Sequence, residues 1–179
     1  ITVEKKYPGT RFYFTAHMDS IVHKMSVDVG FGDVVTPYPA SIDFPLLLPN
    51  TPSVNLQAYS LETVVAEKFH TMIDRDVYNS RMKDFFDCYQ LLTKRELDDE
   101  ILYDAIKATL ESRGLVYNPD LKLFTEDLIN DSNRRFQWEL FLKKIQWKEA
   151  LDFDTVMHVV KERLEPMAER YWENQFKKN

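Results

Sequence analysis

Alternating apolar and polar residues mark three short stretches in the first third of the chain. In residues 11–17, Phe12 and Phe14 fall on the opposite side from the positions between them. Residues 23–29 show the same alternation, and residues 54–58 repeat it once more. A period of two predicts half-buried β-strands. We expect the first two strands to pair as an antiparallel hairpin.

From Ser60 onward the apolar residues recur every three or four positions, which predicts helices for the rest of the chain. Ser60 is a suitable cap for the first helix, and Glu62 lies in its first turn, where a carboxylate is favourable. The expected helices cover about 61–73, 80–92, 96–112, 121–130, 132–147 and 152–172, the last being interrupted or kinked at Pro166.

Between strands and helices, residues 37–53 hold five of the eight prolines. Proline removes a backbone donor, so we expect a long irregular connection here. The complete pattern predicts an α+β fold, in which a small mixed or antiparallel sheet is followed by a helical bundle. We expect the strands and first two helices to form one part, residues 1–93, and the later helices another, residues 94–179.

Composition narrows the class of protein. The single cysteine, Cys88, excludes an internal disulfide and a multi-cysteine zinc site, which favours a reducing, cytoplasmic location. The apolar runs are too short to span a bilayer, so we expect no membrane partner. A net charge of −6 argues against a broad electrostatic interaction with nucleic acid, although it leaves room for a local basic patch.

The strongest local basic patch falls in the helix expected at 132–147, where cations are interleaved with aromatic residues. Its RNA-facing candidates are Arg134, Arg135, Lys143 and Lys144. Two interpretations are open: an amphipathic helix with a solvated basic side, or a surface that faces RNA.

Lys68 is the first candidate for chemistry because its helical neighbours Val64, Val65 and Met72 are apolar. Its stem must therefore run along the buried face of the helix. A lysine in this position either extends along the apolar surface to solvent or points into a cleft, where its ammonium can hold a phosphate.

Four carboxylates complete the candidate set. Asp84 and Asp87 lie three residues apart on one helix side, and Lys83 is spaced to pair with Asp87. They form either a charged helix face or a group in which Asp84 orients Lys68 or holds a metal. Asp28 lies at a strand end, where metal-dependent phosphoryl transfer sites often find a ligand, whereas Asp33 suits a turn.

These motifs, taken in order, resemble the AbiEii/AbiGii nucleotidyltransferase family. The resemblance rests on Val27-Asp-Val-Gly-Phe-Gly-Asp33, a proline-rich link, Leu61-Glu-Thr-Val-Val-Ala-Glu-Lys68, and Arg81-Met-Lys-Asp-Phe-Phe-Asp-Cys-Tyr-Gln-Leu-Leu92. It implies that residues 1–93 are a partial nucleotidyltransferase core, similar to that of DNA polymerase beta, and that residues 94–179 are a carboxyl-terminal helical bundle.

The resemblance also assigns roles to individual residues. It implies that Asp28 completes the metal cluster, that Lys68 contacts a nucleotide phosphate, and that Asp84 is the aspartate of the last motif, with Asp87 the alternative. Glu67 and Arg81 also match the pattern and are expected to support the helix pair.

The implied reaction transfers a nucleoside monophosphate from a nucleoside triphosphate to an acceptor hydroxyl, with Mg²⁺ bridging the phosphates. Some relatives modify tRNA, and toxins of the family are neutralised by a cognate antitoxin, so both are expected partners. The family's first motif, a Gly-Ser or Gly-Thr turn followed by Asp-x-Asp, does not occur in this sequence, so we expect the chain to be incomplete for activity by itself.

Two other functions compete with this one. An inert binding or assembly module could keep the nucleotidyltransferase scaffold without catalysis. A metal-dependent phosphoesterase could use Asp28, Asp84 and Asp87, but the sequence offers it no further support.

Overall fold

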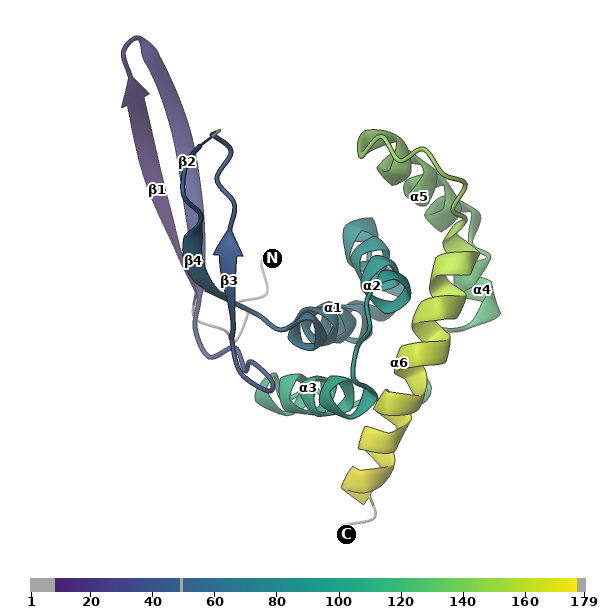
Figure 1. The fold of residues 1–179 in the computed structure, drawn as a ribbon. Coiled ribbons are helices and arrows are strands. Elements are labelled where there is room, and N and C mark those ends of the chain that lie inside the picture. The colour runs from purple at the N-terminus through teal and green to yellow at the C-terminus, as the bar shows by residue number, and fades with distance from the viewer. Residues whose placement is uncertain (1–8, 49, 177–179) are drawn as a thin grey trace. The chain divides into compact units, whose positions relative to one another are not determined.

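The computed structural model describes residues 9–48 and 50–176. The chain divides into two compact units, residues 1–33 and 34–179. The described strands form two separate antiparallel pairs, and six α-helices follow them (Figure 1). This arrangement confirms the predicted α+β class, with two small antiparallel sheets in place of one.

The first unit is a long hairpin of β1 (Gly9–Met18) and β2 (Ile21–Gly30). Its register sets Phe12 opposite Val27 and Phe14 opposite Met25, which places the apolar side chains on one face as expected. These four side chains are nevertheless exposed, each at 48% to 50%. The expectation that one face of the strands is buried is therefore wrong for this unit, because two strands alone cannot bury an apolar face.

A second hairpin, β3 (Ala40–Phe44) and β4 (Val54–Ala58), opens the second unit. The sequence predicted β4 but not β3, and the expected irregular connection is wrong at residues 40–44. The prolines of this region flank β3 and do not interrupt it, so its ladder is intact. Asn55 accepts a hydrogen bond from Ser41 and donates one to Asp43 across the strands.

Helix α1 (Leu61–Arg75) begins at Ser60, whose Oγ accepts a hydrogen bond from Thr63 N at 3.1 Å. The hydroxyls of Ser60 and Thr63 also donate to the carbonyl of Thr36, which ties the connection before β3 to the helix start. This confirms the cap predicted at Ser60. The buried face of α1 includes Val65 and Phe69, both 0% exposed.

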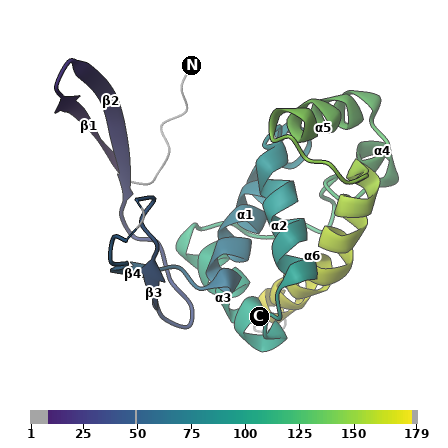
Figure 2. The ribbon, with the colours of Figure 1, turned by 45° about the horizontal axis from the view of Figure 1, so that its top comes forward.

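Together with α1, the remaining helices build a single buried core in the second unit. Figure 2 shows how these helices are arranged. They are η1 (Asp76–Tyr78), α2 (Met82–Lys94), α3 (Asp99–Ser112), α4 (Glu126–Ile129), α5 (Ser132–Lys144) and α6 (Phe153–Phe176). Helix α1 packs against α3, and α2 packs against both α1 and α6. Pro166 lies inside α6 without interrupting it. None of the described helices is long and apolar enough to cross a bilayer.

An aromatic cluster joins the middle of the chain to its end. Trp138 on α5 is 2% exposed and its ring lies against Phe86, Phe141 and Phe153. Its indole N–H donates to the carbonyl of Leu151 at 2.7 Å, so the polar atom is satisfied despite its burial. Because the core is continuous across residue 93, the functional division at that residue stays a prediction.

Candidate functional site

Helices α1 and α2 bring five charged side chains together, which we call the charge cluster. Its members are Lys68, Arg81, Lys83, Asp84 and Asp87. Lys68 comes from the middle of α1, and the two aspartates face it from the first two turns of α2. Sixteen residues separate Lys68 from Asp84, so helix packing alone makes this contact.

Lys68 is held by both aspartates. Its Nζ lies 3.2 Å from Asp84 Oδ1 and 2.7 Å from Asp87 Oδ2. Lys83 approaches Asp87 from the solvent side at 2.5 Å, which confirms the pairing predicted from their spacing. Of the two sequence-based alternatives for Asp84, orienting Lys68 agrees with this geometry.

The cluster sits at the edge of the core. The Asp84 side chain is 3% exposed and the Lys68 side chain 19%. Burial alone would lower the pKa of Lys68, but the hydrogen bond and charge of Asp87, together with the charge of Asp84, raise it above its usual 10.5. Lys68 is therefore a permanent cation at neutral pH.

The same contacts act in the opposite sense on Asp87. Burial would raise its pKa, but hydrogen bonds from Lys68 and Lys83 outweigh that effect and hold the pKa below 3.8. Asp87 is thus ionised in the folded protein at neutral pH, and it does not act as a proton donor there.

Arg81 binds Asp84 from the other side, with its Nε 2.5 Å from Asp84 Oδ2. This hydrogen bond raises the pKa of Arg81. Arg81 also precedes the first turn of α2, and its backbone N–H donates to Asn79 Oδ1 at 2.9 Å. Asp84 lies in that first turn, where the helix dipole favours a negative charge. The start of α2 is thereby held rigidly beside Lys68.

Cys88 follows the aspartates on α2 and is completely buried. Burial raises the pKa of its thiol far above the usual 9.0. A thiol that stays protonated and inaccessible is a poor nucleophile. Cys88 is therefore a packing residue of the core.

Asp28 belongs to the hairpin unit. Its carboxylate receives two hydrogen bonds from Arg11, directly opposite on β1, and both side chains are more than half exposed. The hydrogen bond from Arg11 lowers the pKa of Asp28. Asp33 follows Gly32, whose φ of 87° suits the turn there. Whether Asp28 joins the charge cluster stays a prediction.

Glu67 is directly before Lys68 on α1 but points to another partner. Its Oε2 accepts a hydrogen bond from Arg113, just after α3, at 2.8 Å, and both side chains are largely buried. Glu67 thus links α1 to the end of α3, and the structure does not bring it into the charge cluster.

Arg134 is the least accessible of the RNA-facing candidates, at 8% exposed. Its guanidinium donates to the backbone carbonyls of Val77 and Asn79. These carbonyls end η1, so Arg134 connects α5 to the segment that leads into α2. Two of its guanidinium nitrogens are therefore already hydrogen-bonded within the protein.

The other three RNA-facing candidates are exposed on α5. Arg135 donates to the side chain of Asn130 at 2.5 Å, while Lys143 and Lys144 lie in the last turn of the helix. Their contact with RNA stays a prediction.

No group of three or more His, Cys, Asp or Glu side chains suited to a metal occurs among the described residues. The carboxylates of the charge cluster are already neutralised by Lys68, Arg81 and Lys83. The described residues therefore do not form a complete protein cage for Mg²⁺, although Mg²⁺ is commonly held by one or two carboxylates together with substrate phosphates.

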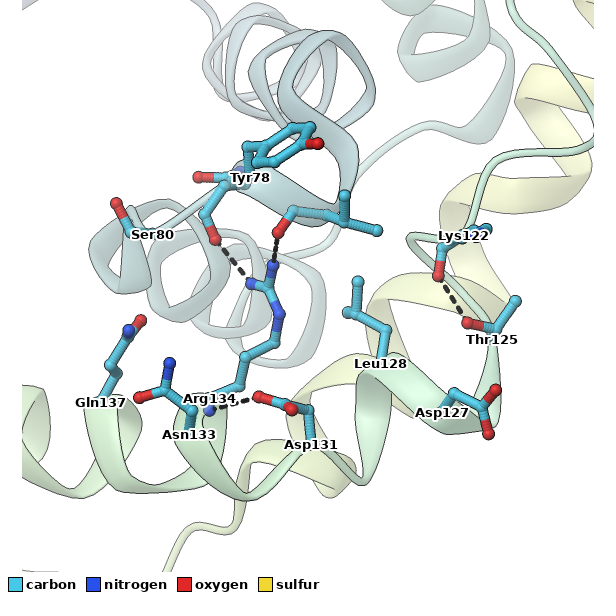
Figure 3. A pocket seen from close by; sticks show the side chains of 12 residues that line it. Tyr78, Ser80, Lys122, Thr125, Asp127, Leu128, Asp131, Asn133, Arg134 and Gln137 are labelled. Atoms are coloured by element: carbon cyan, nitrogen blue, oxygen red, sulfur yellow. Dashed lines mark hydrogen bonds between the residues drawn. The ribbon is translucent and has the colours of Figure 1, made fainter.

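Sequence reasoning missed the pocket beside the charge cluster. It is lined by residues from three distant segments, among them Tyr78, Lys122 and Arg134 (Figure 3). The weak signal in the sequence was a tyrosine between two predicted helices, which by itself is indistinguishable from an ordinary loop residue.

A family model matches most of the chain. The model of a family described as nucleotidyl transferase AbiEii toxin, Type IV TA system, matches residues 1–159, which include the hairpin, the charge cluster and most of the helical core. Searches of curated proteins and of solved structures found no match.

Proposed function

Because the chain belongs to the AbiEii nucleotidyltransferase toxin family, we propose that it transfers a nucleoside monophosphate from a nucleoside triphosphate to an acceptor hydroxyl, with pyrophosphate as the leaving group. The observation that carries this proposal is the charge cluster. It holds three cations and two carboxylates, so it keeps one positive charge in excess beside a rigid helix start.

Lys68 is the residue that we propose binds the triphosphate. An ammonium has three N–H donors, and two of them have partners in Asp84 and Asp87. A phosphate oxygen would take the third. The two carboxylates keep the ammonium charged and hold it in one position, so little reorganisation is needed when the substrate arrives.

Phosphoryl transfer depends mainly on positioning and on neutralising the charge of the phosphates. In this proposal Lys68 neutralises charge on the leaving pyrophosphate. Asp84 and Asp87 are positioning residues, since both act through Lys68. Arg81 strengthens the array by holding Asp84 from the opposite side at 2.5 Å.

Asp28, the metal ligand predicted from the family pattern, is the residue that we propose holds Mg²⁺. When bound, Mg²⁺ would neutralise the phosphates and align the attacking oxygen. The described residues do not form a complete site for the ion, so its remaining ligands would include the substrate phosphates.

The family supports two of the expected partners. Its description names a nucleotidyl transferase, which implies a nucleoside triphosphate substrate, and a type IV toxin–antitoxin system, which implies an antitoxin partner. We propose tRNA as the acceptor, with the exposed side of α5 as one candidate surface for it.

The test is incubation of the full-length protein with each labelled nucleoside triphosphate, Mg²⁺ and total RNA. Labelled RNA is expected with the wild type, and Lys68→Ala should reduce labelling by about 100-fold, a loss typical of transition-state charge stabilisation. Lys161→Ala is the matched control, because Lys161 is also partly buried and its Nζ donates to the carbonyl of Phe124 at 3.0 Å. Full activity of Lys68→Ala would remove this lysine from the mechanism.

An inert binding module is the second candidate function. The observation that favours it is that every carboxylate of the charge cluster already has a cationic partner. Absence of labelling with all four nucleotides, together with intact binding of the antitoxin, would support this alternative over catalysis.

A further inference from the structure

Two neighbouring pockets flank the start of α2. The first, which we call the Arg134 pocket, has a volume of about 520 Å³, within the usual size range of small-molecule sites. It lies between η1, the segment before α4, and α5. Figure 3 shows the Arg134 side chain crossing from α5 to the two carbonyls at the end of η1.

The lining of the Arg134 pocket suits an uncharged polar group better than an isolated anion. Its cations are Lys122 and Arg134, and its carboxylates are Asp127 and Asp131, so the formal charges balance. The pocket therefore gives a lone phosphate no electrostatic advantage.

Asn79 fixes the wall of this pocket. The residue is 1% exposed, and its side-chain Oδ1 accepts a hydrogen bond from the backbone N–H of Arg81. Its backbone carbonyl accepts one from the Arg134 guanidinium at 2.6 Å. The segment between η1 and α2 is therefore held in place beside the pocket.

The other side chains of the Arg134 pocket suit a nucleobase. Tyr78 is 88% exposed and offers a ring for stacking. Asn133 and Gln137 each carry a donor and an acceptor, which is the combination that base edges require. Ser80 adds a hydroxyl that can bind a sugar.

The second pocket, which we call the basic pocket, has a volume of about 540 Å³ and shares Ser80 and Gln137 with the first. Arg81, Lys83 and Lys144 line it, and no acidic residue does. Arg81 and Lys83 hold the aspartates of the charge cluster, while Lys144 adds a further positive charge from α5. Such a surface suits phosphates.

We propose that the two pockets form a path for a single nucleic-acid strand. One base stacks on Tyr78 and bonds to the amides of the Arg134 pocket, and the adjoining phosphodiester lies over the basic pocket. The strand would be the acceptor of the transferred nucleotide, and in this respect the inference rests on the proposed function. The path uses Lys144 but not its neighbour Lys143, which lines neither pocket.

Binding is tested without nucleotide or Mg²⁺, by fluorescence anisotropy of a labelled RNA of about ten nucleotides and its DNA counterpart with the full-length protein. Tyr78→Ala should weaken binding on the order of tenfold, since stacking of one base is lost, and Tyr78→Phe should restore it. Tyr38→Ala is the control, because Tyr38 is also 72% exposed but lines neither pocket.

The basic pocket is tested by Lys144, with Lys94 as the control, because Lys94 is exposed in the last turn of α2 and lines neither pocket. Lys144→Ala should weaken binding several-fold and reduce the slope of log affinity against log salt by about one, whereas Lys94→Ala should leave both unchanged. Equal effects of the two variants, or an unchanged affinity in Tyr78→Ala, would overturn the path.

The binding assay also separates this inference from the proposed function. A protein that binds the strand but labels no RNA contradicts the transferase proposal and leaves the path intact. A protein that labels RNA normally in both Tyr78→Ala and Lys144→Ala contradicts the path and leaves the transferase proposal intact. Preference for RNA over DNA would point to a contact with the 2′-hydroxyl, and equal binding to a backbone contact; both results support the path.

Discussion

Phe14 in the hairpin unit and Phe85 in α2 illustrate how differently the two units treat the same side chain. Both lie on the apolar face of an amphipathic element, yet Phe14 is 49% exposed and Phe85 is 0% exposed. Helix α2 has neighbours on α1 and α6, whereas β1 pairs with β2 alone within its unit. An apolar pattern therefore determines which side chains share a face. That face stabilises the fold only where another element packs against it and buries it.

The ion pairs of the two units differ in the same way. Arg11 and Asp28 meet with both side chains more than half exposed, and such pairs contribute little because water screens them. Lys68 and Asp84 meet with the aspartate 3% exposed, so losing either partner removes a charged hydrogen bond that water cannot replace at the edge of the core. The Arg11–Asp28 pair can therefore separate at little cost in free energy, whereas the Lys68–Asp84 pair contributes to the stability of the helical unit.

The largest difference is expected from matched phenylalanine truncations. Phe85→Ala should lower the free energy of unfolding by about 4 kcal/mol, because it leaves a cavity in a closed core. Phe14→Ala should lower it by about 1 kcal/mol or less, the range of a cross-strand pair. Urea denaturation followed by circular dichroism measures both. Comparable losses would show that the hairpin face is covered as completely as the helical core.

Alanine substitution of the paired aspartates compares the exposed ion pair of the hairpin with the buried one of the helical unit. Asp84→Ala should cost about 2 kcal/mol, since it removes charged hydrogen bonds at the edge of the core, although Lys68 keeps Asp87 as a partner. Asp28→Ala should leave the unfolding free energy nearly unchanged. The same denaturation series tests this pair, and a stable Asp84→Ala variant would place the cluster outside the structural core.

A smaller effect is expected at the start of α1. Ser60→Ala removes the hydroxyl that caps Thr63 N and binds the carbonyl of Thr36, at a cost of about 1 kcal/mol. Ser26→Ala, on the exposed hairpin, is the control and should have no measurable effect. Equal midpoints for Ser60→Ala and wild type would contradict the capping role.

The smallest effect concerns acid stability. The pKa of Asp87 is lower in the folded protein than its usual 3.8, so the unfolded state binds more protons. The stabilisation is therefore complete above that usual pKa and is lost as the pH falls through the folded pKa. Unfolding free energies measured from about pH 7 down to about pH 2 should fall more for wild type than for Asp87→Asn. Identical pH profiles would mean that Lys68 and Lys83 do not stabilise the ionised form.

Local periodicity predicted most elements correctly. The hairpin, β4 and the main helices lie within a few residues of their expected positions, because each has a strong period of its own. Strand β3 was missed, since its five residues lie among prolines and form a strand only by pairing with β4. The interruption expected at Pro166 is wrong, since α6 continues through it with Leu164 and Ala168 buried on either side, whereas a kink there stays a prediction.

The candidate site was less accessible to such reasoning. Lys68, Asp84 and Asp87 could be selected from their neighbours and spacing, but the contact between them depends on how α1 packs on α2. The pockets beside them combine residues more than forty positions apart, such as Asn79 and Arg134. No local pattern contains that information.

By itself the sequence determined which side chains share a face, where Ser60 starts a helix, and which residues match the nucleotidyltransferase motifs, because these depend on near neighbours in the chain. Tertiary structure alone decided which apolar faces are buried, which cations neutralise which carboxylates, and where pockets open. Those outcomes depend on contacts between distant segments, and burial changes the energy of the same side chain severalfold.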